Sequence, residues 1–152
     1  MPEIKLTTVI KADINIVFHL SRDIDFHQKS VPGTGEKAIA GRTSGLIEEG
    51  ETVTWKARHL GIYLTLTTKI VAMNKPYHFT DIMLKGAFKS MKHQHIFNKV
   101  GENTVMTDIF EFQSPFGIIG KLFDKNFLKN YMEKFLLKRN EQIKIAAEKS
   151  RN

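Results

Sequence analysis

The sequence predicts an α+β fold in which a curved antiparallel sheet is wrapped around a long C-terminal helix, with two short helices after the first strand. Three observations predict it. Segments that alternate between apolar and polar residues follow one another across short turns. Two short helical patterns come after the first of them, and a helical pattern occupies the last part of the chain. The 152 residues are expected to form a single domain, 1–152.

The N-terminal part predicts one strand followed by two helices. Glu3–Ile10 alternates Ile, Leu, Thr and Ile with Lys, Thr and Val, which is typical of a strand. Asp13 is a suitable N-cap for a helix over Ile14–Leu20, because its carboxylate can accept a hydrogen bond from a free backbone N–H of the first turn. Asp23 can cap a second short helix that ends near Lys29.

The middle of the chain predicts a run of strands. Expected strands are Glu36–Ala40, Leu46–Glu49, Thr52–His59, Tyr63–Met73, Phe79–Lys85, Phe88–Val100 and Thr104–Gln113. Gly61 and the Asn74-Lys75-Pro76 segment provide turns between them. Turns this short join antiparallel neighbours, so the strands are expected to form a meander.

Pro115 is expected to end the sheet, because proline cannot continue a central strand. The C-terminal part then predicts one long helix from about Ile118 to about Glu148. Its apolar residues recur at helical spacing and form a stripe: Leu128, Tyr131, Met132, Phe135, Leu136 and Ile143. The large surface available to cover this stripe is the concave face of the sheet.

Three segments carry a resemblance to a known superfamily: Glu51–Gly61, Gly86–Phe97 and Thr107–Gly117. With the order of elements, they resemble the START-like superfamily, also called SRPBCC, which includes the birch-pollen allergen and the polyketide cyclase/dehydrase-like proteins. The chain looks like one of its small stand-alone bacterial members. The resemblance implies the helix-grip fold, with a cavity between sheet and helix. It implies no metal, and the superfamily spans lipid carriers, cyclases, hydrolases and protein-interaction domains. No cofactor is expected.

Strand parity then names the expected cavity lining, since side chains two apart on a strand share a face. The apolar candidates are Trp55, Leu64, Leu66, Met83, Met91, Phe97, Met106, Phe110 and Phe112, with Phe127, Tyr131 and Phe135 from the helix. The polar candidates are His59, Asp81, His93, His95 and Asp108. Methionine and aromatic side chains suit an adaptable apolar pocket, and each is also an ordinary core residue.

The two histidines His93 and His95 are the most informative residues of the chain. Together with His59, Asp81 and Asp108 they could perform general acid–base chemistry, as a cyclase or dehydratase requires. Buried polar groups are mostly paired with one another, which favours the other interpretation, a satisfied internal network that fixes strand register. A His-x-His pair with a carboxylate can also bind zinc, but the spacing is a weak signal and no metal is expected.

Composition and charge narrow the range of partners. The chain has 23 Lys and Arg against 16 Asp and Glu, and nine of these cations lie between positions 121 and 152. This excess is expected to be a solvated helix face, with no nucleic-acid partner, although peripheral contact with an anionic membrane stays open. There is no cysteine, and no signal peptide or membrane-length apolar run is recognised, so a cytoplasmic protein is expected. The oligomeric state is not predicted.

The favoured function is binding of a small or medium hydrophobic molecule, lipid-like or similar to a polyketide or other aromatic compound. The apolar wall would provide affinity, and the histidines and aspartates would orient a polar group. Two alternatives remain: an enzyme of the cyclase/dehydratase type that uses the same residues, and a lipid- or protein-interaction domain.

Overall fold

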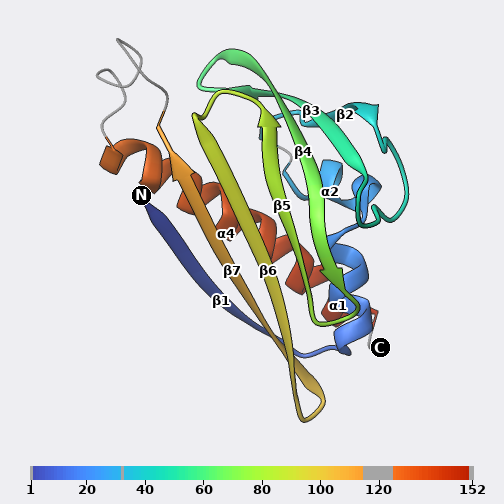
Figure 1. Ribbon diagram of the computed structural model, residues 1–152. Helices are drawn as coiled ribbons and strands as arrows, with labels where there is room; N and C mark the ends of the chain where they lie inside the picture. Colours follow the sequence, from blue (N-terminus) through green and yellow to red (C-terminus); the bar gives the residue numbers. More distant parts are fainter. Residues whose placement is uncertain (1, 32, 115–124, 151–152) are drawn as a thin grey trace.

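The computed structural model describes residues 2–31, 33–114 and 125–150 (Figure 1). Its elements are β1 (Glu3–Ile10), α1 (Ile14–Ser21), α2 (Ile24–Ser30), β2 (Lys37–Gly41), β3 (Thr52–His59), β4 (Ile62–Asn74), β5 (His78–Lys85), β6 (Ser90–Val100), β7 (Asn103–Gln113) and α4 (Lys125–Lys149).

All seven of these strands form one antiparallel sheet in the order β1-β7-β6-β5-β4-β3-β2. From β2 to β7 each strand pairs with the next one in sequence, as in a meander, and β1 closes the far edge against β7. Helices α1, α2 and α4 lie on one side of the curved sheet (Figure 1). This arrangement confirms the predicted fold class.

Both N-terminal helices begin at their predicted caps. The Asp13 carboxylate accepts a hydrogen bond of 2.8 Å from the backbone N–H of Asn15. The Asp23 carboxylate accepts one of 3.1 Å from the backbone N–H of Phe26. Each cap satisfies one of the N–H groups that a first helical turn leaves free, and the two caps therefore fix where the chain turns back across the sheet.

One predicted strand is wrong. Leu46–Glu49 forms no strand, and its ladder contact is a single bridge between Leu46 and Asp23. The backbone of Ile47 is bonded to Arg22 instead: its N–H donates to the Arg22 carbonyl, and its carbonyl accepts from the Arg22 guanidinium at 2.9 Å. The segment thus anchors the end of α1.

The remaining boundaries differ little from the predictions. Strand β6 begins at Ser90 rather than at Phe88. Helix α4 is described from Lys125, so the predicted helical residues 118–124 lie outside the described part of the chain. No helix of the described residues is long and apolar enough to cross a membrane.

The core lies between the sheet and the helices, in two clusters. One contains Phe18, Phe97, Met106 and Ile143 among others. The other contains Ile4, Leu6, Met91, Phe110, Phe112 and Leu136. Along β7 the even-numbered residues are buried and the odd-numbered ones are partly exposed, which confirms the parity assigned to this strand.

Candidate functional site

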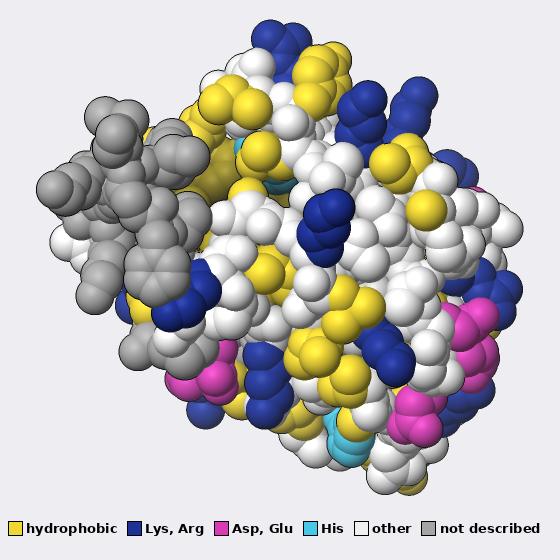
Figure 2. Space-filling model, turned by 45° about the horizontal axis from the view of Figure 1, so that its top comes forward, with side chains coloured by type: hydrophobic (Ala, Val, Ile, Leu, Met, Phe, Trp, Pro, Cys, Tyr) yellow, Lys and Arg dark blue, Asp and Glu magenta, His cyan; other side chains and the backbone are white. Residues whose placement is uncertain are grey.

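A cavity of about 130 Å³ lies between the sheet and the helices. Eight of the predicted residues line it: Trp55, Leu66, Asp81, Met91, His93, His95, Phe110 and Phe135. The lining that was not predicted includes Arg22, His27, Glu36, Phe79, Met132 and Arg139. On the face shown in Figure 2, hydrophobic side chains rim a hollow in which a histidine is visible.

The two histidines of β6 each pair with a carboxylate on a neighbouring strand. His93 Nε2 lies 2.8 Å from Asp108 Oδ1 on β7, and His95 Nε2 lies 2.9 Å from Asp81 Oδ1 on β5. Their ring centroids lie 3.7 Å apart with the planes tilted by 30°, and the His95 ring stacks on Phe79 with centroids 4.1 Å apart. The pairing therefore ties three adjacent strands together through their inward side chains.

Asp108 is the centre of this network and is fully buried. Besides His93, it accepts a hydrogen bond of 2.7 Å from Asn140 Nδ2 and a longer one of 3.5 Å from Arg139 Nη1. His95 Nδ1 lies 3.3 Å from the same carboxylate but makes no directed hydrogen bond with it. A buried carboxylate with this many donors is stabilised in its ionised form.

Arg139 and Asn140 were missed by the sequence analysis. Both are buried on α4, three and four residues after Leu136 and four and three before Ile143, so they lie on the apolar stripe. Polar residues on a stripe at this spacing were a signal that the sheet facing them holds polar partners. The Arg139 guanidinium also contacts the Ser21 carbonyl and lines the cavity.

The network lowers the pKa values of both His93 and Asp108, for different physical reasons. Burial, and after it the neighbouring His95, lower the pKa of His93 to about 4 against the opposing pull of Asp108. Burial alone would raise the pKa of Asp108, but the hydrogen bond from His93, the nearby His95 ring and the Arg139 charge hold it well below its ordinary value. At neutral pH the site therefore contains a neutral His93 beside an ionised Asp108 and the Arg139 cation.

Asp81, His93 and His95 bring potential metal-ligating atoms within 4.8 Å of one another. The ring geometry does not suit a shared ion. Zinc lies about 2.0–2.1 Å from an imidazole nitrogen, along its lone pair and hence in the ring plane. The centroids of these two rings are 3.7 Å apart and their planes are tilted by 30°, so an ion about 2 Å from a nitrogen in the plane of one ring lies well outside the plane of the other. Chelation would require both rings to turn.

A second polar group lies toward the β2 edge of the sheet. Glu36 keeps 8 % of its side-chain surface exposed, and its Oε1 lies 2.9 Å from His27 Nε2. The His27 ring packs on Trp55 at 4.3 Å. Neither Glu36 nor His27 was predicted as a site residue. Glu36 was assigned to the start of a strand that begins at Lys37 in the structure, and His27 lies in a short helix without a recognisable pattern.

Other predicted site residues lie outside the lining that the described residues provide. His59 is not part of the His/Asp network: its Nδ1 lies 2.7 Å from the Tyr131 hydroxyl, and its ring contacts Phe135. Leu64 and Phe127 were expected to line the cavity but are 36 % and 47 % exposed. Met83, Phe97, Met106 and Phe112 are packed in the two core clusters instead.

No protein-family model matches the chain. No curated protein matches it either.

Solved structures do match it over nearly its whole length. TTHA0849 from Thermus thermophilus is 17% identical with a TM-score of 0.73, covering 96% of this chain and 99% of its own. Ginseng major latex-like protein 151 from Panax ginseng is 19% identical with a TM-score of 0.70, covering 96% and 97%. A START superfamily protein from Mycobacterium smegmatis is 11% identical with a TM-score of 0.75, covering 97% of each chain. The chain therefore shares the helix-grip fold of these structures.

Proposed function

We propose that the protein binds a small, largely apolar molecule with a polar group in the cavity between the sheet and α4. The observation that carries this proposal is the composition of the lining. Trp55, Leu66, Met91 and Phe110 offer apolar contact, and Arg139 enters the same space with the His/Asp network beside it. Pockets that are mostly apolar with a few convergent polar groups are typical of small-molecule sites.

The cavity volume sets the size of the ligand. Sites for drug-sized ligands usually measure about 300–1,000 Å³, and this cavity has about 130 Å³. An apolar cavity of about 150 Å³ is known to admit benzene. A molecule with one ring or a short branched chain matches the space, whereas a long acyl chain would require the layers to separate.

Filling the cavity tests the proposal, with p-cresol as a probe that combines one ring and one hydroxyl group. Met132 lines the cavity from α4, whereas Leu137 on the same helix is 48 % exposed. We expect isothermal titration calorimetry to detect p-cresol binding to the wild type and to Leu137→Trp, and to detect none with Met132→Trp. Equal binding by the two variants, or no binding by the wild type, would contradict the proposal.

Acid–base catalysis in the same cavity has less support. Both His93 and His95 use Nε2 to contact a carboxylate. A general base needs a nitrogen that reaches the substrate proton. The Nδ1 atom of His95 is buried beside Asp108. The network is better suited to holding the cavity wall in place than to moving a proton.

A further inference from the structure

The hairpin that joins β3 to β4 presents a row of apolar side chains to solvent. Leu60 is 51 % exposed, Ile62 57 %, Tyr63 67 % and Leu64 36 %. We call these four residues the β3–β4 tip. It lies at the upper end of the sheet in Figure 1, away from the core. Large apolar side chains gathered in the open at one hairpin of a folded protein are typical of a surface that contacts a partner.

The backbone of the tip carries a second, independent observation. Leu60 has a φ of 53° and Gly61 a φ of 82°, so both central residues of the turn are left-handed. A two-residue turn of this type favours Asn or Asp at its first central position and Gly at its second. A leucine there is strained, since its Cβ disfavours the left-handed region. The chain thus keeps an exposed apolar residue where a polar one would fold better.

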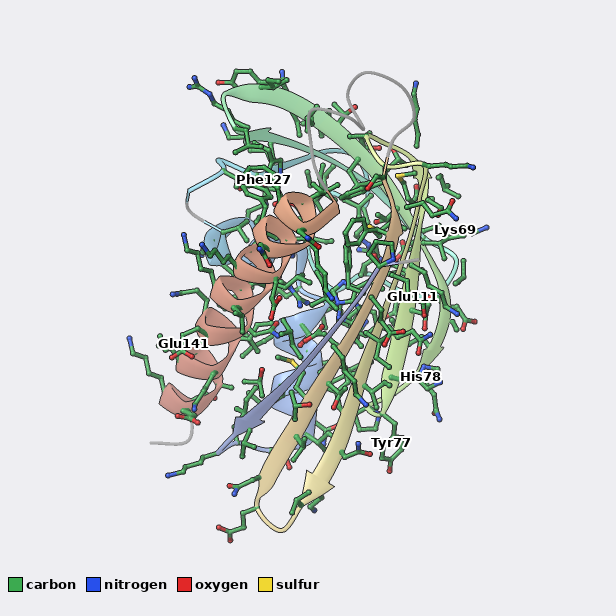
Figure 3. The ribbon with its side chains drawn as sticks, turned by 90° about the vertical axis from the view of Figure 1, so that its left-hand side faces the viewer. Lys69, Tyr77, His78, Glu111, Phe127 and Glu141 are labelled. Atoms are coloured by element: carbon green, nitrogen blue, oxygen red, sulfur yellow. The ribbon has the colours of Figure 1, made fainter. Side chains whose placement is uncertain are left out.

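Charge identifies the kind of partner. Strand β3 brings two cations next to the tip, Lys56 and Arg58, and contains no acidic residue. Lys56 Nζ and the Arg58 guanidinium lie 5.5 and 5.8 Å from the centre of the Tyr63 ring, within the patch itself. Lys69 points away from α4 on the outer side of the sheet (Figure 3). Figure 2 shows Lys and Arg side chains among hydrophobic ones, with Asp and Glu along the right-hand edge and at the lower left.

We propose that the β3–β4 tip inserts into the surface of an anionic lipid bilayer, with the cations of β3 contacting the headgroups. Leucine and isoleucine side chains enter the acyl boundary, tyrosine suits the headgroup level, and each nearby cation is attracted to the negative leaflet. Nucleic acid offers the same negative charge but no apolar layer for Leu60 and Ile62. The proposal concerns a surface apart from the cavity, so it stands or falls independently of ligand binding.

Replacement of Leu60 by Asn separates membrane contact from folding, because Asn relieves the strain in the turn while removing the apolar side chain. Val100 is the matched control: it is 57 % exposed at the β6–β7 hairpin, at the opposite end of the sheet (Figure 1). Co-sedimentation with vesicles of phosphatidylcholine alone, or of phosphatidylcholine with phosphatidylglycerol, measures binding of wild type, Leu60→Asn and Val100→Asn. Thermal unfolding of the same samples measures stability.

We expect the wild type and Val100→Asn to sediment with the anionic vesicles and not with the neutral ones, and high salt to weaken the binding. Leu60→Asn should bind at least about tenfold more weakly, since burial of one leucine contributes that much, and should melt at the same temperature as the wild type or higher. Equal binding to neutral and anionic vesicles, or unchanged binding by Leu60→Asn, would overturn the proposal. So would duplex DNA that displaces the wild type and Leu60→Asn from the vesicles equally well.

Discussion

Asp108 and Asp81 accept hydrogen bonds from neighbouring histidines but differ in their surroundings. Asp108 has no exposed side-chain surface and also contacts Arg139 and Asn140, whereas Asp81 keeps 15 % of its surface exposed and contacts His95. The two residues occupy the same sheet face, so the difference comes from α4. Both residues are aspartates, so their different contributions to stability come from their positions in the network.

Loss of the charge at Asp108 should be the most costly polar substitution in the site. We expect Asp108→Asn to lower the free energy of unfolding by about 3–5 kcal/mol, because it leaves the buried Arg139 cation without its counterion. Asp81→Asn should cost about 1–2 kcal/mol, the value of one hydrogen bond to a charged group near solvent. Urea denaturation measures both. Equal losses of unfolding free energy in the two variants would mean that Asp108 is not the counterion that Arg139 needs.

The low pKa of His93 predicts a defined pH dependence of stability. The folded-state pKa is about 4 and the ordinary value is 6.5, so between these values the unfolded chain binds more protons than the folded one. Stability should therefore fall as the pH decreases from 6.5 toward 4, by roughly 3 kcal/mol at the end of that window. The carboxylates Asp81 and Asp108, with lowered pKa values, lose their contribution only at lower pH.

His93→Gln tests this assignment, since glutamine can still donate to Asp108 but does not titrate. Urea denaturation at pH values of about 7.5, 6.5, 5.5 and 4.5 should give a flatter profile for the variant than for the wild type. The remaining slope comes from His59 and His19, whose pKa values are lowered chiefly by burial. A wild-type profile that matches the variant would show that His93 does not carry the effect.

At the scale of single elements, the sequence predicted most of what the structure contains. The caps at Asp13 and Asp23, the strand Thr52–His59 and the parity of β7 follow from local chemistry and period-two alternation. Leu46–Glu49 failed because its backbone bonds to Arg22, a partner that no local pattern announces.

The same distinction explains the site. Parity brought Asp81, His93, His95 and Asp108 to one face correctly. Parity did not predict which side chains pair, because the hydrogen bonds run diagonally between neighbouring strands. It also did not predict the contacts of Asp108 with Arg139 and Asn140 on α4, which lie 31 and 32 residues later in the sequence. His59 has the right parity but lies near the end of β3, where Tyr131 is its neighbour.

The contribution of α4 to stability should come from the side chains on its buried face. Ile143 is 1% exposed within the larger core cluster, whereas Ile145 on the same helix is 42 % exposed. We expect Ile143→Ala to lower the free energy of unfolding by about 2–4 kcal/mol through lost burial and a residual cavity. Ile145→Ala should change it by less than about 0.5 kcal/mol. Comparable losses in urea denaturation would mean that α4 is packed on both faces.

At the scale of the whole molecule, the separation of sheet and helices limits what can be bound. Met91 lines the cavity and is 6 % exposed. We expect Met91→Ala to bind naphthol, a two-ring probe that the wild type excludes, while both bind p-cresol. Calorimetry measures the binding, and the variant should remain folded although about 2–5 kcal/mol less stable. Binding of naphthol by the wild type would show that the layers open.

The order of strands in the sheet has a consequence for how the molecule is made. Strand β1 is the first to leave the ribosome, yet its neighbour β7 ends at Gln113. Strand β1 therefore cannot join the sheet until β7 has been synthesised, and α4, which covers the concave face, follows β7. Contacts between such distant segments form slowly. The inward side chains of the sheet therefore stay uncovered until β7 and α4 have both been made.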